Sequence, residues 1–456
     1  MRFDTVFSIV ESHRKGVVTP PETVRRCYER IRALGDPGIF ITLRDEGEAV
    51  AEAHGLTKNR DFYGVPVVVK DNIDVAGMLT TAACPAFAYQ AEDDAEVVKR
   101  LKRAGAVIVG KTNLDQFATG LVGVRTPYPA PRNPLRRDLI PGGSSAGSAV
   151  AVATGIVPIA LGTDTAGSGR VPAMLNNIVG LKPSLGLIST RGVVPACRTL
   201  DCVSVFALSV DDAWTALRAM AGYDPKDPYS RERALAALSS ASTQAKLGVP
   251  LMSQRLFFGD GRAAADYKAA LSRLKHMGFQ LVEVDMEPFT ETAQLLYHGP
   301  WLAERYLAVR KIIEENPNAL HPVTRAIIAP GANLKASDTF AAFYRLAELR
   351  RAADDIFERI DALVLPTAPT VYTNEQVLAD PIRLNSRLGT YTNFVNLLDL
   401  CAAAVPAALH GDGTPFGITF IAPGGQDALA ASLAKSFHNI CGVAPGVQAK
   451  LEVLAK

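Results

Sequence analysis

The sequence lacks most of the features that mark secreted, membrane-spanning or nucleic-acid-binding proteins. It has six cysteines in 456 residues and no C-x-x-C pair, which argues against a disulfide framework and against a cysteine-ligated zinc site. No stretch comes near the ~18 uncharged apolar residues of a membrane helix. The net charge of +2 gives no excess of one sign for binding nucleic acid or an anionic membrane.

The N-terminus also lacks a secretion signal, because its apolar run over residues 1–7 is short and charged early. A composition of 48% hydrophobic and 21% charged residues is ample for a large core. We therefore expect a reduced, cytoplasmic protein that acts on a small molecule. We expect no metal, no cofactor, and no nucleic-acid or membrane partner, and a homodimer is compatible with the sequence.

Helix and strand patterns alternate along the chain, which predicts an α/β fold with helices on both faces of a sheet. The clearest helix start is Thr19, a capping residue followed by two prolines and Glu22. The expected helices are 20–33, 45–57, 93–104, 148–154, 263–276, 300–314 and 336–360, and the expected strands are 65–69, 106–110, 156–161, 280–284, 362–365, 401–405 and 417–421.

The composition shifts toward Pro, Ala and Ser over residues 223–245. A domain linker is one interpretation. The modest length favours a surface excursion between two halves of one domain.

Residues 140–182 hold two glycine-serine turns, Gly142–Ser145 and Ala166–Gly169, around an apolar segment. Glycine lets a backbone approach a ligand closely, and serines beside free amide donors are what acyl transfer requires. Each turn alone is most simply an ordinary loop. A phosphate-binding loop is disfavoured because no lysine follows Gly147 or Gly169 as GxxxxGK[ST] demands.

A nucleophile elbow is the next alternative, since residues 143–147 satisfy G-x-S-x-G with Ser145 at the centre. That motif should follow a strand, whereas residues 131–138 have the composition of an irregular loop. It also needs a histidine, and the seven histidines occur singly, although a distant one could still meet the serine in the fold.

A lysine base is the remaining interpretation. Lys70 ends a valine-rich run that predicts a strand buried on both faces. Poor solvation lowers the pKa of a lysine and makes the neutral amine accessible as a general base. A lysine that merely reaches solvent from a strand end is the structural alternative.

Together these segments resemble the amidase signature family. The resemblance rests on VVVKDNIDVAG around Lys70, GGSS at 142–145, TDTAGSGR at 163–170 and GLKP at 180–183, and it spans nearly the whole chain. TDTAGSGRVPA is most similar to the allophanate hydrolases of that family. The resemblance implies one α/β/α amidase-signature domain over 1–456, built on a large mixed twisted sheet, without the smaller C-terminal domain common in allophanate hydrolases.

The resemblance also implies site residues. Lys70, Ser144 and Ser168 would form a Ser-cisSer-Lys triad in which Ser168 is the nucleophile and Ser144 relays its proton to Lys70. The peptide before Ser144 would be cis. The backbone of Thr165, Ala166 and Gly167 would form the oxyanion hole, with Ser145, Asp164 and Arg170 in supporting roles.

Substrate choice would rest on Tyr297 and Arg305 in the motif YHGPWLAER, because a guanidinium binds a carboxylate bidentately. We expect Tyr297 in the loop before a helix that Pro300 opens. The resemblance implies hydrolysis of allophanate to ammonia and N-carboxycarbamate, which decarboxylates. Two alternatives stay open: hydrolysis of another small acyl amide, such as malonamate or a biuret derivative, and a partner-dependent subunit resembling an amidotransferase component.

Overall fold

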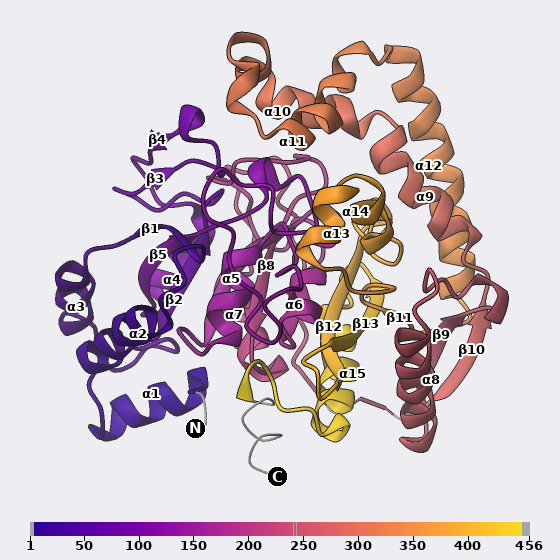
Figure 1. The fold of residues 1–456 in the computed structure, drawn as a ribbon. Helices are drawn as coiled ribbons and strands as arrows, with labels where there is room; N and C mark the ends of the chain where they lie inside the picture. The colour runs from indigo at the N-terminus through magenta and orange to yellow at the C-terminus, as the bar shows by residue number, and fades with distance from the viewer. Residues whose placement is uncertain (1–3, 240, 243, 449–456) are drawn as a thin grey trace.

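An 11-stranded sheet runs through the computed structural model, which describes residues 4–239, 241–242 and 244–448 (Figure 1). Neighbouring strands pair in both directions, so the predicted α/β fold on a large mixed sheet is confirmed. Across the sheet the order is β1 (Phe40–Leu43), β5 (Val107–Thr112), β2 (Pro66–Lys70), β6 (Ile159–Asp164), β8 (Cys202–Ala207), β7 (Val179–Lys182), β12 (Leu400–Leu409), β13 (Pro415–Pro423), β11 (Ala362–Pro366), β9 (Lys246–Pro250) and β10 (Gln280–Val284). Strands β3 (Leu79–Thr80) and β4 (Tyr89–Gln90) form a separate hairpin.

Both faces of the sheet are buried, as the valine run of β2 requires. Successive side chains of a strand point to opposite faces, and Val67 and Val69 join one hydrophobic cluster while Val68 joins another. The first cluster includes α4 (Glu96–Arg103), α7 (Val210–Met220), α8 (Gly261–His276) and α15 (Asp427–Cys441). The second includes α2 (Pro20–Leu34), α3 (Glu46–His54) and α5 (Ala146–Ala153).

The remaining helices lie around this layered centre. In Figure 1, α10 (Trp301–Glu315) and α11 (Pro322–Ile328) lie at the top, while α9 (Glu287–His298) and the long α12 (Ala336–Phe357) run down one side. The others are α1 (Val6–Lys15), α6 (Val171–Leu175), α13 (Asn374–Ala379) and α14 (Arg383–Leu388). No helix in the described part of the chain has the length and apolarity that crossing a membrane requires.

Helix ends follow local sequence chemistry. Helix α2 begins at Pro20, and Thr19 and Glu22 cap it reciprocally, as predicted. The strand predicted to begin at 156 starts only at Ile159. Helix α5 ends at Ala153 with Thr154 as its C-cap, Gly155 follows at φ 69°, and the N–H of Ile156 donates back to Ala151 O, so the first residue of the predicted strand closes the helix end instead.

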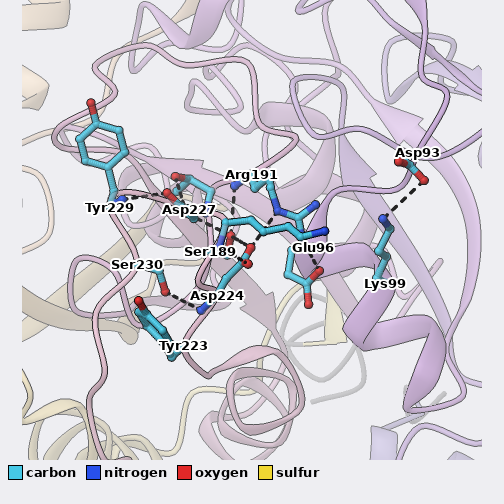
Figure 2. A network of polar contacts seen from close by, with 12 residues as sticks. Asp93, Glu96, Lys99, Ser189, Arg191, Tyr223, Asp224, Asp227, Tyr229 and Ser230 are labelled. Carbon is cyan, nitrogen blue, oxygen red and sulfur yellow. Dashed lines mark hydrogen bonds and ion pairs between the residues drawn. The ribbon is translucent and has the colours of Figure 1, made fainter.

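The segment 223–245 is held against neighbouring loops by buried carboxylates (Figure 2). Ser189 Oγ donates to Asp224 at 2.8 Å and to Asp227 at 3.0 Å, and Arg191 Nε donates to Asp224 at 2.9 Å. These contacts support the surface-excursion interpretation over a free linker. Residues 240 and 243 of this segment, the first three residues of the N-terminal stretch and residues 449–456 lie outside the described residues.

Candidate active site

Two adjacent parallel strands, β2 and β6, carry the centre of the site. Their register aligns Val69 with Leu161, so Lys70 at the end of β2 lies beside the last residues of β6, Thr163 and Asp164. The carboxyl ends of parallel strands meet at one edge of a sheet, where ligands commonly bind. The chain then turns directly from Asp164 into the second glycine-serine turn.

The Lys70 amine is fully buried, and its hydrogen-bond partners among the described residues are hydroxyl groups. Its Nζ donates to Ser144 Oγ at 2.8 Å and to Thr163 Oγ1 at 2.7 Å. Burial lowers the pKa of Lys70 to about 7, although the charges of Asp115, Asp201 and Asp164 raise it. The amine can therefore take up and release a proton near neutral pH.

The first glycine-serine turn presents Ser144 to this lysine. The Gly143–Ser144 peptide is cis, as the family resemblance implies. A Cβ on Gly143 would lie 2.0 Å from Asp115 Oδ2, so no side chain fits there. The Asp115 N–H donates to Ser144 O at 3.0 Å, which fixes the turn from the opposite side.

A buried carboxylate organises the second turn. Asp164 pairs with Arg170 Nε and Nη2, each at 2.9 Å, and accepts the N–H groups of Gly167 at 2.8 Å and Gly169 at 3.0 Å. Burial raises the pKa of Asp164, but the Arg170 charge and these donors lower it overall. Asp164 and Arg170 thus hold the loop around Ser168.

Ser168 lies in this loop with 3% of its surface exposed. Its hydroxyl makes no hydrogen bond within the described part of the chain. Of the three predicted oxyanion donors, the Gly167 N–H is already used by Asp164. The N–H groups of Thr165 and Ala166 have no partner among the described residues, so they are the donors open to a substrate oxygen.

Tyr297 and Arg305 lie together, as expected, but Tyr297 is not in a loop. It belongs to the last turn of α9, which extends to His298 before Pro300 starts α10. The helix pattern continues through LLYH because none of these residues breaks a helix. The Arg305 guanidinium is 1% exposed and lies 5.4 Å from the centre of the Tyr297 ring.

The elbow alternative finds no support here. The Ser145 hydroxyl donates to Thr163 O at 3.2 Å and accepts the Thr163 N–H at 3.3 Å, so it braces β6. Among the described histidine side chains, none hydrogen-bonds to Ser145 or Ser168. No group of three or more His, Cys, Asp or Glu among the described residues could hold a metal ion.

Sequence reasoning missed several residues that support the site. Thr163, within a quoted motif, binds the lysine amine. Thr392 Oγ1 donates to Ala166 O at 2.7 Å, and Asn396 Nδ2 donates to Asp164 O at 2.8 Å. Thr392 and Asn396 come from a stretch with no motif, so only the fold reveals them.

Comparison with known proteins fits this geometry. The sequence model of the Amidase family matches residues 22–430. The chain belongs to this family. The amidase-signature resemblance is therefore confirmed. One relative is a component of the glutamyl-tRNA(Gln) amidotransferase of Lacticaseibacillus paracasei, which is 32% identical over 94% of this chain and 95% of that protein.

The amidase also resembles enzymes of urea metabolism. The allophanate hydrolase of Kluyveromyces lactis superposes with a TM-score of 0.92 at 41% identity, covering 98% of this chain and 75% of that one. The urea amidolyase of Saccharomyces cerevisiae is 47% identical over 83% of this chain. This chain spans only 21% of the length of that amidolyase.

Removing Arg170 should destabilise the protein strongly. In Arg170→Met the Asp164 carboxylate would stay buried without its cation, and breaking a buried pair costs about 3–5 kcal/mol. Chemical denaturation should show that loss in the free energy of unfolding. The control is Arg136→Met, whose partner Asp138 is 51% exposed, because exposed pairs contribute only about 0–1 kcal/mol. Equal losses in the two variants would contradict the assigned role of Asp164 and Arg170.

Proposed function

We propose that this amidase hydrolyses a small linear amide through an acyl-enzyme on Ser168. The observation that carries the proposal is the 2.8 Å contact between the Lys70 amine and Ser144 Oγ. A lysine with a pKa of about 7 can act first as a general base and then as a general acid near neutral pH.

In the first half-reaction Ser168 Oγ attacks the amide carbonyl. Its proton passes to Ser144, while the Ser144 proton passes to the neutral amine of Lys70. The tetrahedral intermediate then collapses, and the proton returns from Lys70 through Ser144 to the leaving nitrogen. Water, activated along the same path, hydrolyses the acyl-enzyme and frees Ser168.

The unpaired N–H groups of Thr165 and Ala166 would stabilise the oxyanion of each tetrahedral intermediate. Each such donor contributes roughly 3–4 kcal/mol to transition-state stabilisation. We assign no such role to Gly167, whose N–H is occupied by Asp164. Asp164, Arg170 and Ser145 act as supports that hold both turns in place.

The substrate that we propose is allophanate. The resemblance to allophanate hydrolase and urea amidolyase supports it, and so does a buried guanidinium at Arg305, which suits a carboxylate. Attack on the terminal carbonyl would release ammonia and leave N-carboxycarbamate after hydrolysis. Loss of both carboxylates of that product, with uptake of two protons, gives two molecules of carbon dioxide and a second ammonia.

An ammonia-supplying component of a larger enzyme is the second candidate, supported by the full-length similarity to the amidotransferase component. Hydrolysis of another carboxylated amide, such as malonamate, is the nearer alternative. A single-domain organisation over 1–456, a cytoplasmic location and a homodimer stay predictions.

The direct test is ammonia release from allophanate by the purified chain alone. We expect steady turnover, and Ser168→Ala should abolish it because no acyl-enzyme can form. Ser272→Ala, at an exposed serine of α8, is the matched control and should retain full activity. Turnover only in the presence of a second protein would favour the amidotransferase alternative, and turnover by Ser168→Ala would refute the nucleophile.

The pH dependence should report Lys70. Burial lowers its pKa to about 7, and only the neutral amine can accept the serine proton. We therefore expect kcat/KM to rise about tenfold per pH unit below about pH 7 and to level off above it. An acid limb centred near pH 10, the range of an ordinary lysine, would show that Lys70 is not the base.

Arg305 should determine the preference for a carboxylate. In Arg305→Gln, kcat/KM for allophanate should fall by the factor that corresponds to a loss of about 2–5 kcal/mol of binding free energy. The kcat/KM for biuret, the neutral carboxamide counterpart of allophanate, should change little. The control is Arg310→Gln, on the same helix but 61% exposed. If the two substrates lose equally, the substrate assignment is wrong.

A further inference from the structure

A second buried arginine, Arg125, lies beside Arg305. Arg125 is 2% exposed and Arg305 is 1% exposed. Both bind the same residue: Arg125 Nη1 donates to Thr119 O at 2.9 Å, and Arg305 Nη1 donates to Thr119 Oγ1 at 3.2 Å. The two guanidinium groups are thus neighbours across one threonine.

Neither guanidinium has a carboxylate partner in the described part of the chain. The other hydrogen bond of the Arg125 guanidinium goes to Pro381 O at 2.6 Å, and the Nε atoms of both arginines are buried without a partner. A buried charge without a counter-ion is costly, by several kcal/mol. Burial lowers the pKa of Arg305, whereas Asp201 and Glu304 raise it without a hydrogen bond to Arg305 among the described residues, so a bound anion would supply the partner that both guanidinium groups lack.

The carboxylate of Asp115 does not fill this role. Its Oδ1 accepts the backbone N–H of Arg125 at 2.9 Å, and its Oδ2 accepts the N–H groups of Val122 at 3.1 Å and Gly123 at 2.9 Å. It folds the loop rather than pairing with the guanidinium. Burial lowers the pKa of Arg125. Interactions with Asp115 and Tyr297 raise this pKa, and the charge of Arg305 lowers it. The two arginines therefore lie within electrostatic reach of each other.

We propose that Arg125 is a positioning residue that determines specificity for a negatively charged substrate. It fixes Thr119, whose hydroxyl orients Arg305, and it adds a second positive charge beside the guanidinium that would bind the carboxylate. This inference rests on the proposed function, and it narrows the substrate class to small amides with an anionic group beyond the scissile bond. Neutral diamides of the same size are disfavoured.

The mechanism of this selection is electrostatic as well as geometric. The Thr119 hydroxyl donates to Phe117 O at 3.1 Å, so its lone pairs face the Arg305 donor in one fixed direction. Arg125 donates both to the Thr119 carbonyl and to the carbonyl of Pro381, a residue between α13 and α14. A substrate carboxylate at Arg305 would thus meet a guanidinium that is already oriented, with a second positive charge beside it.

The test compares Arg125→Gln with Arg125→Lys. In Arg125→Gln we expect KM for allophanate to rise about tenfold, because a disoriented Arg305 would lose about one charge-assisted hydrogen bond to the carboxylate, with kcat nearly unchanged and biuret hydrolysis affected little. Arg125→Lys keeps the charge and should recover most of the loss. Equal losses for allophanate and biuret, or no recovery by lysine, would overturn the proposal and assign Arg125 a merely structural role.

Binding measurements separate this inference from the proposed reaction. In a Ser168→Ala background, calorimetry with malonamate and with neutral malonamide measures charge selectivity without turnover. We expect malonamate to bind more tightly than malonamide. In Arg125→Gln the ratio of the two affinities should fall about tenfold. If the protein shows this selectivity but does not hydrolyse allophanate, the proposed substrate is wrong and the role of Arg125 stands. If the protein hydrolyses allophanate but Arg125→Gln keeps full selectivity, the substrate stands and the role of Arg125 is wrong.

A second variant covers the case in which Arg125→Gln does not fold. Thr119→Val removes the hydroxyl that orients Arg305 and should weaken malonamate binding in the same way, while Thr119→Ser keeps the hydroxyl and should not. Unchanged selectivity in Thr119→Val would contradict the link between the two arginines.

Discussion

The whole site depends on an amine that is buried without a carboxylate in contact. Among the residues that the structure describes, Lys70 hydrogen-bonds to the hydroxyls of Ser144 and Thr163 alone, and neither can neutralise a positive charge. Because a desolvated ammonium is unfavourable, the neutral form is accessible near pH 7. Valines on both faces of β2 create that desolvation, so the core of the sheet and the chemistry at its edge share one physical cause.

Two buried carboxylates, those of Asp164 and Asp115, organise the loops around the Lys70 amine. Asp164 gathers the N–H groups of Gly167 and Gly169, and Asp115 gathers those of Val122, Gly123 and Arg125. In each case a fixed negative charge satisfies backbone donors in a glycine-containing turn. Asp164 thus holds the second glycine-serine turn, and Asp115 holds the loop over residues 122–125.

Much of this arrangement could be predicted from the sequence, because it is encoded locally. The valine run before Lys70, the cap at Thr19 and the two glycine-serine turns each follow from neighbouring residues. The proposed triad of Lys70, Ser144 and Ser168 came from the family resemblance, since no spacing rule relates these positions, and the structure shows the contact between Lys70 and Ser144. What sequence could not give were contacts across the fold: Thr392 and Asn396 on the second turn, the use of the Gly167 N–H by Asp164, and the helical setting of Tyr297.

The anchoring of the nucleophile loop by Thr392 and Asn396 has a consequence for biosynthesis. Ser168 is translated long before these anchors, which lie 226 and 232 residues beyond the atoms that they hold. A nascent chain can form β2, β6 and both turns early, yet the loop stays untethered on one side until Thr392 and Asn396 have also emerged. The loop around Ser168 is thus completed late, when the segment just before β12 packs against it.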